Sequence, residues 1–447
     1  MDGLVMTAQI LLSLTILVGL HEIGHLVAAK FFGMRVEEYS IGFPPKLFKF
    51  NWKGTEYALS AIPLGGYVKI SGMIDESMDV EAMKEEPKEW EFRSKPAWQR
   101  LIVMLGGIIV NVILGVFIFI GLTYFVGEEY LPKDEVNRVG GIKALEIGEE
   151  IGLKNGDKII KINGQDFESI NDMLNPDLLL VDDAFYTVER NGEMVDVNIP
   201  SNFMEYLSDK KNAGKIFTVW VSSEIGTVVE GGIAERAGIK VGDIITAVND
   251  VKVASFDAFS KEVKNISSDS ITIQVLRKGE EFTFSEYFKN DSIIGVGSVI
   301  PPQKAYITYG LGESISVGTK KAFGIVFTQL KAFKKIFSGQ LSVTKSLSGP
   351  IGIAQAYGGD WEWERFWRMT GLLSMVLAFM NLLPIPALDG GHVMFLSFEI
   401  LSGKKPGDKF MEYAQKFGMI ILLSLMVFVI FNDIFRLDTI QSLFGLD

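Results

Sequence analysis

The sequence predicts a polytopic α-helical membrane protein with four transmembrane helices and two copies of a small domain inserted between the second and third helices. Three observations lead to this fold class. Hydrophobic residues make up 48% of the 447 residues while 22% are charged, which fits apolar helices combined with sizeable aqueous parts. Four stretches approach the roughly 20 apolar residues that a helix needs to cross the hydrocarbon layer. One short motif occurs twice in the region between them.

The four apolar stretches cover residues 4–30, 101–126, 366–401 and 412–435. The first follows no basic cluster, so we expect a retained membrane helix rather than a cleaved signal peptide. The third stretch contains Pro384 and Pro386, which remove backbone donors. Irregular backbone at membrane depth is tolerated mainly where it is buried in protein or lines a wet cavity. We therefore expect a break in the third helix.

Basic residues in the short loops predict the orientation of the helices, because such loops remain in the cytoplasm. We expect cytoplasmic loops after the first and third helices. The N-terminus, the segment of about 127–365 and the acidic tail ending at Asp447 should then lie on the opposite face. The basic residues are Arg35, Lys46, Lys49, Lys53, Lys69, Lys84 and Lys88 in one loop and Lys404, Lys405 and Lys409 in the other.

The repeated motif spans Gly152–Gly164 and returns as Gly238–Asp250 at a constant offset of 86 residues. In each copy a Gly-Asp turn leads into alternating apolar residues and a second turn, as in a strand that enters a hairpin. The pattern resembles the PDZ domain, a small mixed α/β fold, and predicts two such domains at 127–212 and 213–300. The loop at 230–234 is closer to the carboxylate-binding loop of PDZ domains, so the second copy is the better candidate for binding peptide tails.

The linker at 301–365 contains phenylalanine and leucine residues that recur near helical spacing among lysines, between Lys320 and Ser338. This pattern predicts an amphipathic helix. It fits a helix lying in the membrane interface and equally a helix that packs against the core of the soluble part.

Composition narrows the possible partners and metal ligands. The net charge of −12 and the lack of clustered basic residues argue against nucleic acid as a partner. The chain has no cysteine, so disulfide bonds and thiolate zinc sites are excluded. A metal ion would have to be bound by histidine, aspartate or glutamate.

All three histidines of the chain fall in two short motifs: His21 and His25 in HEIGH, and His392 in LDGGH. Residues at positions i and i+4 lie on one face of a helix, so His21 and His25 can bind one ion. Glu22 projects from the adjoining face and can take a proton from a water that zinc has acidified. Ionisable residues within an apolar helix indicate a functional site. The motif therefore predicts a zinc site within a membrane.

A catalytic zinc normally has three protein ligands and one open position. The candidates for the third ligand are His392 and the carboxylate of Asp389, which follows the proline-interrupted part of the third helix. Spacing alone does not choose between them.

The two motifs and the tandem PDZ-like domains resemble the site-2 protease family of intramembrane zinc metalloproteases (peptidase M50), and within it the bacterial regulator of sigma-E protease type. The resemblance covers nearly the whole chain. It implies that Asp389 is the third zinc ligand and that His392 lies just outside the ligand set. The matching stretches are residues 21–25, 39–43, 54–57, 62–69, 348–353 and 381–390.

The resemblance also implies how the chain is organised. Residues 1–126 and 366–447 would be the two halves of a membrane protease domain. The protein would lie in the bacterial cytoplasmic (inner) membrane, with its active site towards the cytoplasm and its PDZ-like domains outside.

Substrate-binding roles follow from the same resemblance. Asn381, in one motif with Pro384, would contact the backbone of an unwound substrate, although polar packing between helices is the alternative. A membrane-dipping hairpin would offer an edge strand to the substrate, the alternative being a plain cytoplasmic hairpin. Asn111, together with Gly107, resembles a family motif whose usual proline is Ile108 here, so packing is an equal possibility. The edge strand contains Gly66, Tyr67 and Val68.

The implied function is cleavage within a transmembrane segment of a single-span membrane protein embedded in the lipid bilayer. The family suggests an anti-sigma factor that another protease has already shortened. Two other functions fit the sequence: a membrane scaffold that captures peptide tails through its PDZ-like domains while its metal site is inert, and the clearance of remnant signal peptides.

Overall fold

The computed structural model describes residues 2–73, 86–200, 202–208, 214–266, 268–287, 294–299, 302–346 and 348–435. Lys84 and the tail ending at Asp447 lie outside the described residues. The chain forms two compact units. The helical unit comprises residues 1–127, 308–334 and 343–447, and the β-rich unit comprises residues 128–307 and 335–342.

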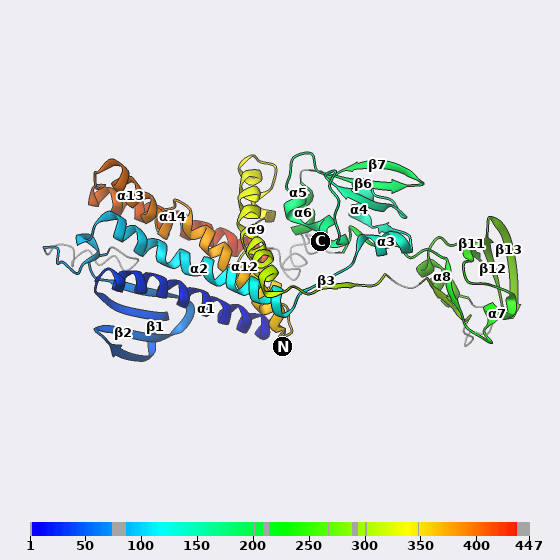
Figure 1. Cartoon of the computed structure of the whole chain (residues 1–447), viewed down its shortest axis with the longest axis horizontal. Coiled ribbons are helices and arrows are strands. Elements are labelled where there is room, and N and C mark those ends of the chain that lie inside the picture. Colours follow the sequence, from blue (N-terminus) through cyan, green and yellow to red (C-terminus); the bar gives the residue numbers. More distant parts are fainter. Residues whose placement is uncertain are drawn as a thin grey trace. The chain divides into compact units, whose positions relative to one another are not determined.

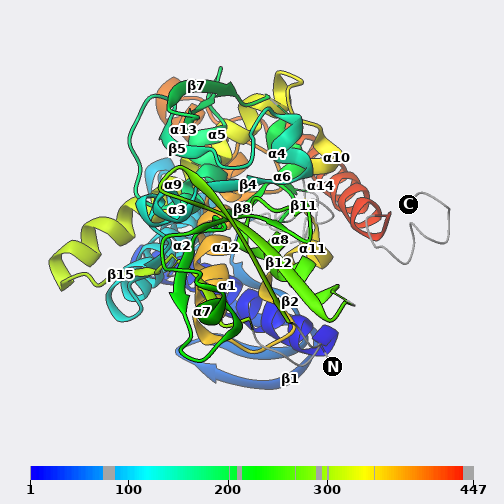
Figure 2. The same ribbon diagram turned by 90° about the vertical axis from the view of Figure 1, so that its right-hand side faces the viewer.

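Three helices form the centre of the helical unit: α1 (Asp2–Phe31), α2 (Ala97–Phe125) and α12 (Trp363–Leu382). Each packs against the other two, and Figure 1 shows α1, α2 and α12 running side by side in blue, cyan and orange; Figure 2 gives the view turned by 90°. Short helices α10 (Val343–Ser346) and α11 (Pro350–Tyr357) precede α12. Two further helices follow α12 and complete the unit: α13 (Asp389–Ser402) and α14 (Asp408–Phe435).

Three helices in the described part of the chain are long and apolar enough to cross a membrane: α1, α2 and residues 409–435 of α14. The predicted stretch at 366–401 is not one helix. It consists of α12 and α13, separated by residues 383–388, because Pro384 and Pro386 interrupt the backbone hydrogen bonds there. The break was predicted, but neither of the two resulting helices is by itself both long and apolar enough to cross a membrane.

Glycines bring α1 and α2 into backbone contact. A Cβ atom built on Gly24 would lie 2.2 Å from the carbonyl oxygen of Gly106, and one built on Gly106 would lie 2.5 Å from the carbonyl oxygen of Gly24. No other residue type fits at either position without moving a helix. Small residues at helix contacts are typical of packing within membranes, where close backbone approach replaces the hydrophobic effect as a source of stability.

Two long strands, β1 (Val36–Trp52) and β2 (Thr55–Ile70), form a sheet that follows α1. The register pairs Ser40 with both Ala58 and Tyr67, so the first half of β1 lies between two stretches of β2. The stretch that ends at Ile70 forms an edge, since no further strand pairs with it among the described residues. Figure 1 shows this sheet beside α1.

Helix α9 (Leu311–Phe337) contains the predicted amphipathic segment and is longer than predicted. Within the helical unit, Ala322, Ile325 and Val326 pack against Phe119 and neighbouring residues of α2. Large apolar side chains such as Phe327 remain exposed. The helix thus packs on one side against α2 and presents an apolar surface on another.

The β-rich unit contains the two repeated segments, each with its own core. The first core gathers Ile142, Ile159, Tyr186 and Phe203, and the second gathers Ile225, Ile245, Phe259 and Ile273, among others. Both domains are mixed α/β structures. Ile216 and the strand that follows it pack into the first core, so the first domain reaches past the predicted boundary at 212.

The first repeat domain consists of β4 (Ile142–Ala144), β5 (Lys158–Ile162), β6 (Phe185–Arg190), β7 (Glu193–Asn198) and β8 (Phe217–Val219), with helices α3 (Lys133–Val139), α4 (Glu146–Glu150), α5 (Pro176–Leu179) and α6 (Phe203–Ser208). The second consists of β9 (Ile225–Val228), β10 (Ile244–Val248), β11 (Val251–Lys252), β12 (Ser270–Arg277), β13 (Glu280–Tyr287) and β14 (Val296–Ser298), with α7 (Ile233–Ala237) and α8 (Phe256–Lys264). Strands β3 (Glu128–Tyr130) and β15 (Ala305–Ile307) pair where the chain enters and leaves the unit.

The Gly-Asp turn of each repeat holds the same buried ion pair. Arg277 donates two hydrogen bonds of 2.6 Å to the carboxylate of Asp243, which also accepts one from the Lys240 backbone N–H. Arg190 and Asp157 make the same contacts in the first repeat. The aspartate side chains are 0–1% exposed. Bidentate pairs of this kind fix the geometry of the turn.

The contact between α1 and α2 predicts the effect of one methyl group. Gly24→Ala should lower the free energy of unfolding by about 1–3 kcal/mol, because its Cβ would overlap the Gly106 backbone and force the helices apart. Gly121→Ala on α2 is the matched control, since its Cβ meets no atom within 4 Å. Thermal unfolding in detergent would measure both. Equal melting temperatures for the two variants would contradict the close contact.

The Asp243–Arg277 pair predicts a pH-dependent stability of the second repeat domain. Burial would raise the pKa of Asp243, but the hydrogen bonds from Arg277 and the Lys240 N–H outweigh burial and hold the pKa below its usual value. The stabilisation is therefore present above the unfolded pKa and is lost as the pH falls through the lower folded pKa. Asp243→Asn should destabilise this domain by about 1.5–3 kcal/mol at pH 7, and the difference from the wild type should shrink towards pH 3.

Hydrogen exchange of the β10 and β12 amides, compared between variant and wild type at each pH, would measure this difference. Asp269→Asn, an exposed aspartate of the same domain, is the control and should change exchange at neither pH. A difference between Asp243→Asn and the wild type that stays constant from pH 7 to pH 3 would contradict the role of the ionised pair.

Candidate metal centre

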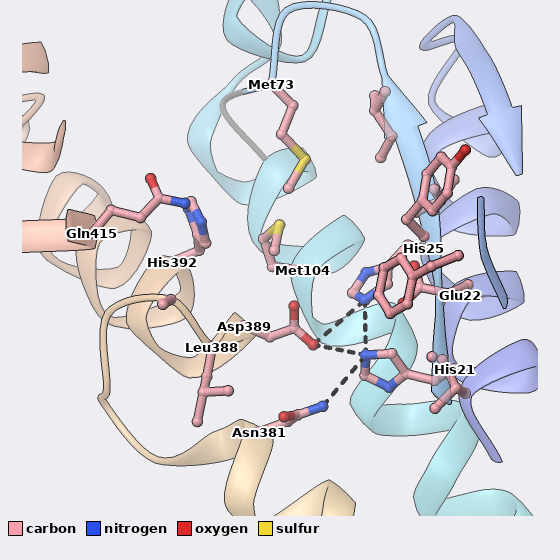
Figure 3. A pocket seen from close by; sticks show the side chains of 18 residues that line it. His21, Glu22, His25, Met73, Met104, Asn381, Leu388, Asp389, His392 and Gln415 are labelled. Atoms are coloured by element: carbon pink, nitrogen blue, oxygen red, sulfur yellow. Dashed lines mark hydrogen bonds and ion pairs between the residues drawn. The ribbon is translucent and has the colours of Figure 1, made fainter. Parts of the chain in front are cut away.

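Three potential ligands from the two ends of the sequence meet between α1 and α13. His21, His25 and Asp389 place their ligand atoms within 4.8 Å of one another. The Nε2 atoms of the two histidines are 3.2 Å apart, and Asp389 Oδ2 lies 3.1 Å from His21 Nε2 and 3.4 Å from His25 Nε2. Figure 3 shows the three side chains converging.

These distances fit a zinc ion. Zinc binds nitrogen and oxygen at about 2.0–2.2 Å, so two ligand atoms of a tetrahedral site lie roughly 3.3 Å apart. All three separations are close to that value. Asp389 Oδ2 is also buried without a hydrogen-bond donor among the described residues, as expected of an atom that faces a cation. The set of two imidazoles and one carboxylate can hold zinc and leave one position open.

Gly107 on α2 provides the space behind the two imidazoles. A Cβ atom at this position would lie 2.5 Å from His21 Cε1 and 2.5 Å from His25 Nε2. Any larger residue would push the histidines out of place. The backbone of α2 therefore forms one wall of the metal centre.

Hydrogen bonds from α2 orient both histidines. His25 Nδ1 lies 2.8 Å from the carbonyl oxygen of Val103, so it donates its proton there and directs Nε2 to the cluster. His21 Nδ1 lies 3.2 Å from the side-chain amide of Asn111. Outer hydrogen bonds of this kind are usual for metal-binding histidines, because they fix the tautomer and the ring orientation.

Asp389 owes its position to the break between α12 and α13. It is the first residue of α13, and the helix N-terminus favours a negative charge there. A buried ion pair attaches α13 to α2: Arg100 Nη2 lies 2.5 Å from Glu399 Oε1, and these side chains are 9% and 18% exposed. The pair ties the helix that carries the third ligand to the helix that supports the first two.

A cavity of about 540 Å³ opens beside the cluster. His21, Glu22, His25 and Asp389 line it, with Asn381 from the end of α12. The edge stretch of β2 also lines the cavity, and a Cβ atom on Gly66 would lie 3.6 Å from Glu22 Cγ. Val68 of the same stretch lines the cavity together with Glu22. An extended peptide along this edge would thus pass close to both the cluster and Glu22.

The structure brings most of the predicted site residues to this cavity. Glu22, Gly66, Tyr67, Val68 and Asn381 line it. Asn381 Nδ2 lies 3.4 Å from His21 Nε2.

Two of the predicted residues do not line the cavity, and a third lines it outside the ligand cluster. Pro384 is exposed in the break and does not line the cavity, and Asn111 is buried behind His21. His392 lines the cavity but does not belong to the ligand cluster, and Figure 3 shows it beside Gln415. Spacing had left Asp389 and His392 as equal candidates, and the geometry favours Asp389.

Several contributors to the site had not been predicted from the sequence. Val103 acts through its backbone carbonyl, which carries no side-chain signature. Met73 and Met104 line the cavity as ordinary apolar residues, and Gln415 reaches it from α14. Arg100 and Glu399 had a detectable signal, since charged residues are uncommon next to apolar helices.

Comparison with known proteins agrees with this geometry. The model of peptidase family M50 matches residues 9–425. A Haemophilus influenzae protein named regulator of sigma E protease is 30% identical, with 96% of this chain and 98% of the relative covered. A Vibrio cholerae protein whose name describes a zinc metalloprotease is 29% identical with the same coverage. The regulator of sigma E protease of Salmonella typhi is 26% identical, again over 96% and 98%.

The family model spans both the HEIGH segment and Asp389, and the relatives align over almost their entire length. The chain therefore belongs to peptidase family M50 and is a zinc metalloprotease.

Proposed function

We propose that this zinc metalloprotease cuts a peptide bond within a transmembrane segment of another membrane protein. The observation that carries the proposal is the location of the ligand cluster. His21 and His25 lie on α1, which is long and apolar enough to span a bilayer. α2, which is also long and apolar enough to span a bilayer, forms one wall of the metal centre. A peptide bond that reaches this cluster must therefore lie at membrane depth.

In this mechanism His21, His25 and Asp389 hold the zinc ion. Bound zinc would supply Lewis-acid chemistry, polarising the scissile carbonyl and lowering the pKa of water. Glu22 acts as the general base that removes a proton from the attacking water. It then donates that proton to the leaving amine. Its place in the cavity next to the two histidines supports both roles.

The edge stretch of β2 is proposed to bind the substrate by strand addition. A transmembrane helix hides its backbone, so the segment must unwind before it can be cut. The edge at Gly66, Tyr67 and Val68, with which no further strand pairs among the described residues, would offer backbone partners to the extended chain. Asn381, whose amide faces the cluster, is placed to contact a substrate carbonyl near the scissile bond. Pro384 contributes by keeping the chain between α12 and α13 irregular.

We further propose four membrane crossings, with α12 and α13 together forming the third. Basic residues in the two short loops support an orientation with the metal centre towards the cytoplasm. The two repeat domains would then lie outside the bacterial inner membrane as PDZ-like domains, the second being the better candidate for peptide tails. The exposed apolar side chains of α9 are consistent with a location in the membrane interface.

The proposed substrate is a single-span anti-sigma factor that another protease has already shortened. The relatives in Haemophilus influenzae and Salmonella typhi are named for regulation of sigma E, which supports a substrate in sigma-factor control. Remnant signal peptides are the second candidate, because they are also single apolar helices with short flanks. A scaffold with an inert metal site is less well supported, since the ligand set and Glu22 are all in place.

Replacement of the general base should separate metal binding from catalysis. Glu22→Gln is expected to retain one zinc ion per chain and to lose cleavage of a single-span reporter by at least about 100-fold. Metal analysis of the purified variant and cleavage in proteoliposomes would measure this. Glu364→Gln, an exposed glutamate on α12, is the control. Full-rate cleavage by Glu22→Gln would contradict the mechanism and would favour another base.

Substitution of the two candidates for the third ligand should distinguish them. Asp389→Ala is expected to lose stoichiometric zinc, because it removes one of three ligands. His392→Ala should keep it, because His392 lies outside the cluster. Metal content after dialysis against a weak chelator would compare the variants. The reverse pattern would assign the ligand to His392.

A further inference from the structure

We propose that Asn111 is a positioning residue of the metal centre: its side-chain oxygen accepts the Nδ1–H of His21 and so presents Nε2 of His21 to the ion. The inference rests on the proposed role of His21 as a ligand. It assigns to Asn111 a function different from the contact with substrate that family resemblance suggested.

The ring of His21 has two distinct sides. Its Nε2 atom faces Asp389 Oδ2 at 3.1 Å and His25 Nε2 at 3.2 Å. Its Nδ1 atom faces away from the cluster, towards the Asn111 amide at 3.2 Å. A neutral imidazole that binds a metal through Nε2 carries its proton on Nδ1. The group opposite Nδ1 must therefore be an acceptor.

The Asn111 side chain can supply that acceptor. The residue is 1% exposed, and its Oδ1 atom has no hydrogen-bond partner among the described residues. The oxygen and nitrogen of an amide are exchanged by a half-turn of the group, and the choice between them follows the hydrogen-bond network. With Oδ1 towards His21, the unpaired buried oxygen gains a donor and Nδ1–H gains an acceptor. In either orientation of the amide, a polar atom of Asn111 faces Nδ1 of His21.

The backbone of Asn111 is anchored as well. Ser374 on α12 donates a hydrogen bond of 2.7 Å to the Asn111 carbonyl oxygen. This bond links α12 to the turn of α2 that faces His21. It limits rotation of α2 about its axis, so the amide stays aligned with the imidazole.

Position along α2 strengthens the assignment. Val103, Gly107 and Asn111 are four residues apart and share one face of the helix. Val103 accepts from His25, Gly107 leaves space for both rings, and Asn111 lies against His21. The two histidines, four residues apart on α1, thus each meet an outer partner from α2. Because His25 has an outer hydrogen-bond partner on α2, we expect His21 to have one there as well.

A direct role in substrate binding is a poorer fit. Asn111 does not line the cavity, and His21 lies between its amide and the cluster. A peptide in the cavity would touch Asn381 and the β2 edge, not Asn111.

The test is zinc affinity of the purified full-length protein, measured by competition with a chromophoric chelator. Asn111→Leu keeps the shape and removes the acceptor, and it should weaken zinc binding by about 10–100-fold. Asn111→Asp restores an acceptor and should bind zinc within a few-fold of the wild type. Thr123→Val is the matched control and should leave affinity unchanged, because it removes another buried polar group of the same helix that has no partner among the described residues.

Two further measurements keep the outcome decisive. Thermal unfolding of the metal-free variants separates a folding defect from a loss of zinc affinity. The proposal would be overturned if Asn111→Leu and Asn111→Asp weakened zinc binding equally and both also had lower melting temperatures. An unchanged zinc affinity in Asn111→Leu would also overturn it. His21→Ala tests the underlying assumption that His21 is a zinc ligand. Full zinc affinity in that variant would refute this role.

Discussion

The backbone contact between α1 and α2 at Gly24 and Gly106 is the constraint on which the metal centre depends. It brings the helices so close that the space for the imidazoles is set by the next glycine, Gly107. A slightly larger separation would leave His25 out of reach of the Val103 carbonyl. The geometry of the ligands is therefore a property of helix packing as much as of the HEIGH motif.

Two buried polar contacts in the helical unit join different helices. Arg100 on α2 meets Glu399 on α13, and Ser374 on α12 meets the Asn111 carbonyl on α2. In an apolar surrounding an unpaired charge is much more unfavourable than in water. Each pair therefore opposes separation of its two helices, and together they hold the α13 ligand against the α1 ligands.

Asp433 on α14 makes a comparable contact at another place. Its carboxylate accepts hydrogen bonds from the backbone N–H groups of Gly349, Ile351 and Gly352 at the start of α11. A carboxylate at a helix N-terminus satisfies donors that the helix itself cannot. This contact fixes the far end of α14, which is otherwise largely exposed.

The motif-based part of the site could be predicted from the sequence, and the packing-based part could not. HEIGH predicts two ligands and a base through helical spacing alone. The choice between Asp389 and His392 could not be made from spacing, because it depends on where α13 begins after the break. The outer partner Val103 is a backbone carbonyl, so no residue type reveals it.

The fold shows the same division. The Gly-Asp turns were found because Asp157 and Asp243 recur at one offset. The offset does not identify their arginine partners, because Arg190 and Arg277 are 87 residues apart, one residue more than the two aspartates. The break at Pro384 was predictable from proline chemistry, whereas the end of the first domain beyond residue 212 depends on strand pairing distant in sequence.

The site residues come from distant parts of the sequence, so the ribosome synthesises them at different times. His21 and Asn381 are 360 residues apart. At about 5–20 residues per second, synthesis of the intervening chain takes roughly 20–70 s. During that interval α1 already carries Glu22 and two histidines, but the third ligand does not yet exist. The nascent protein therefore cannot bring Asp389 to the two histidines until α13 has been made.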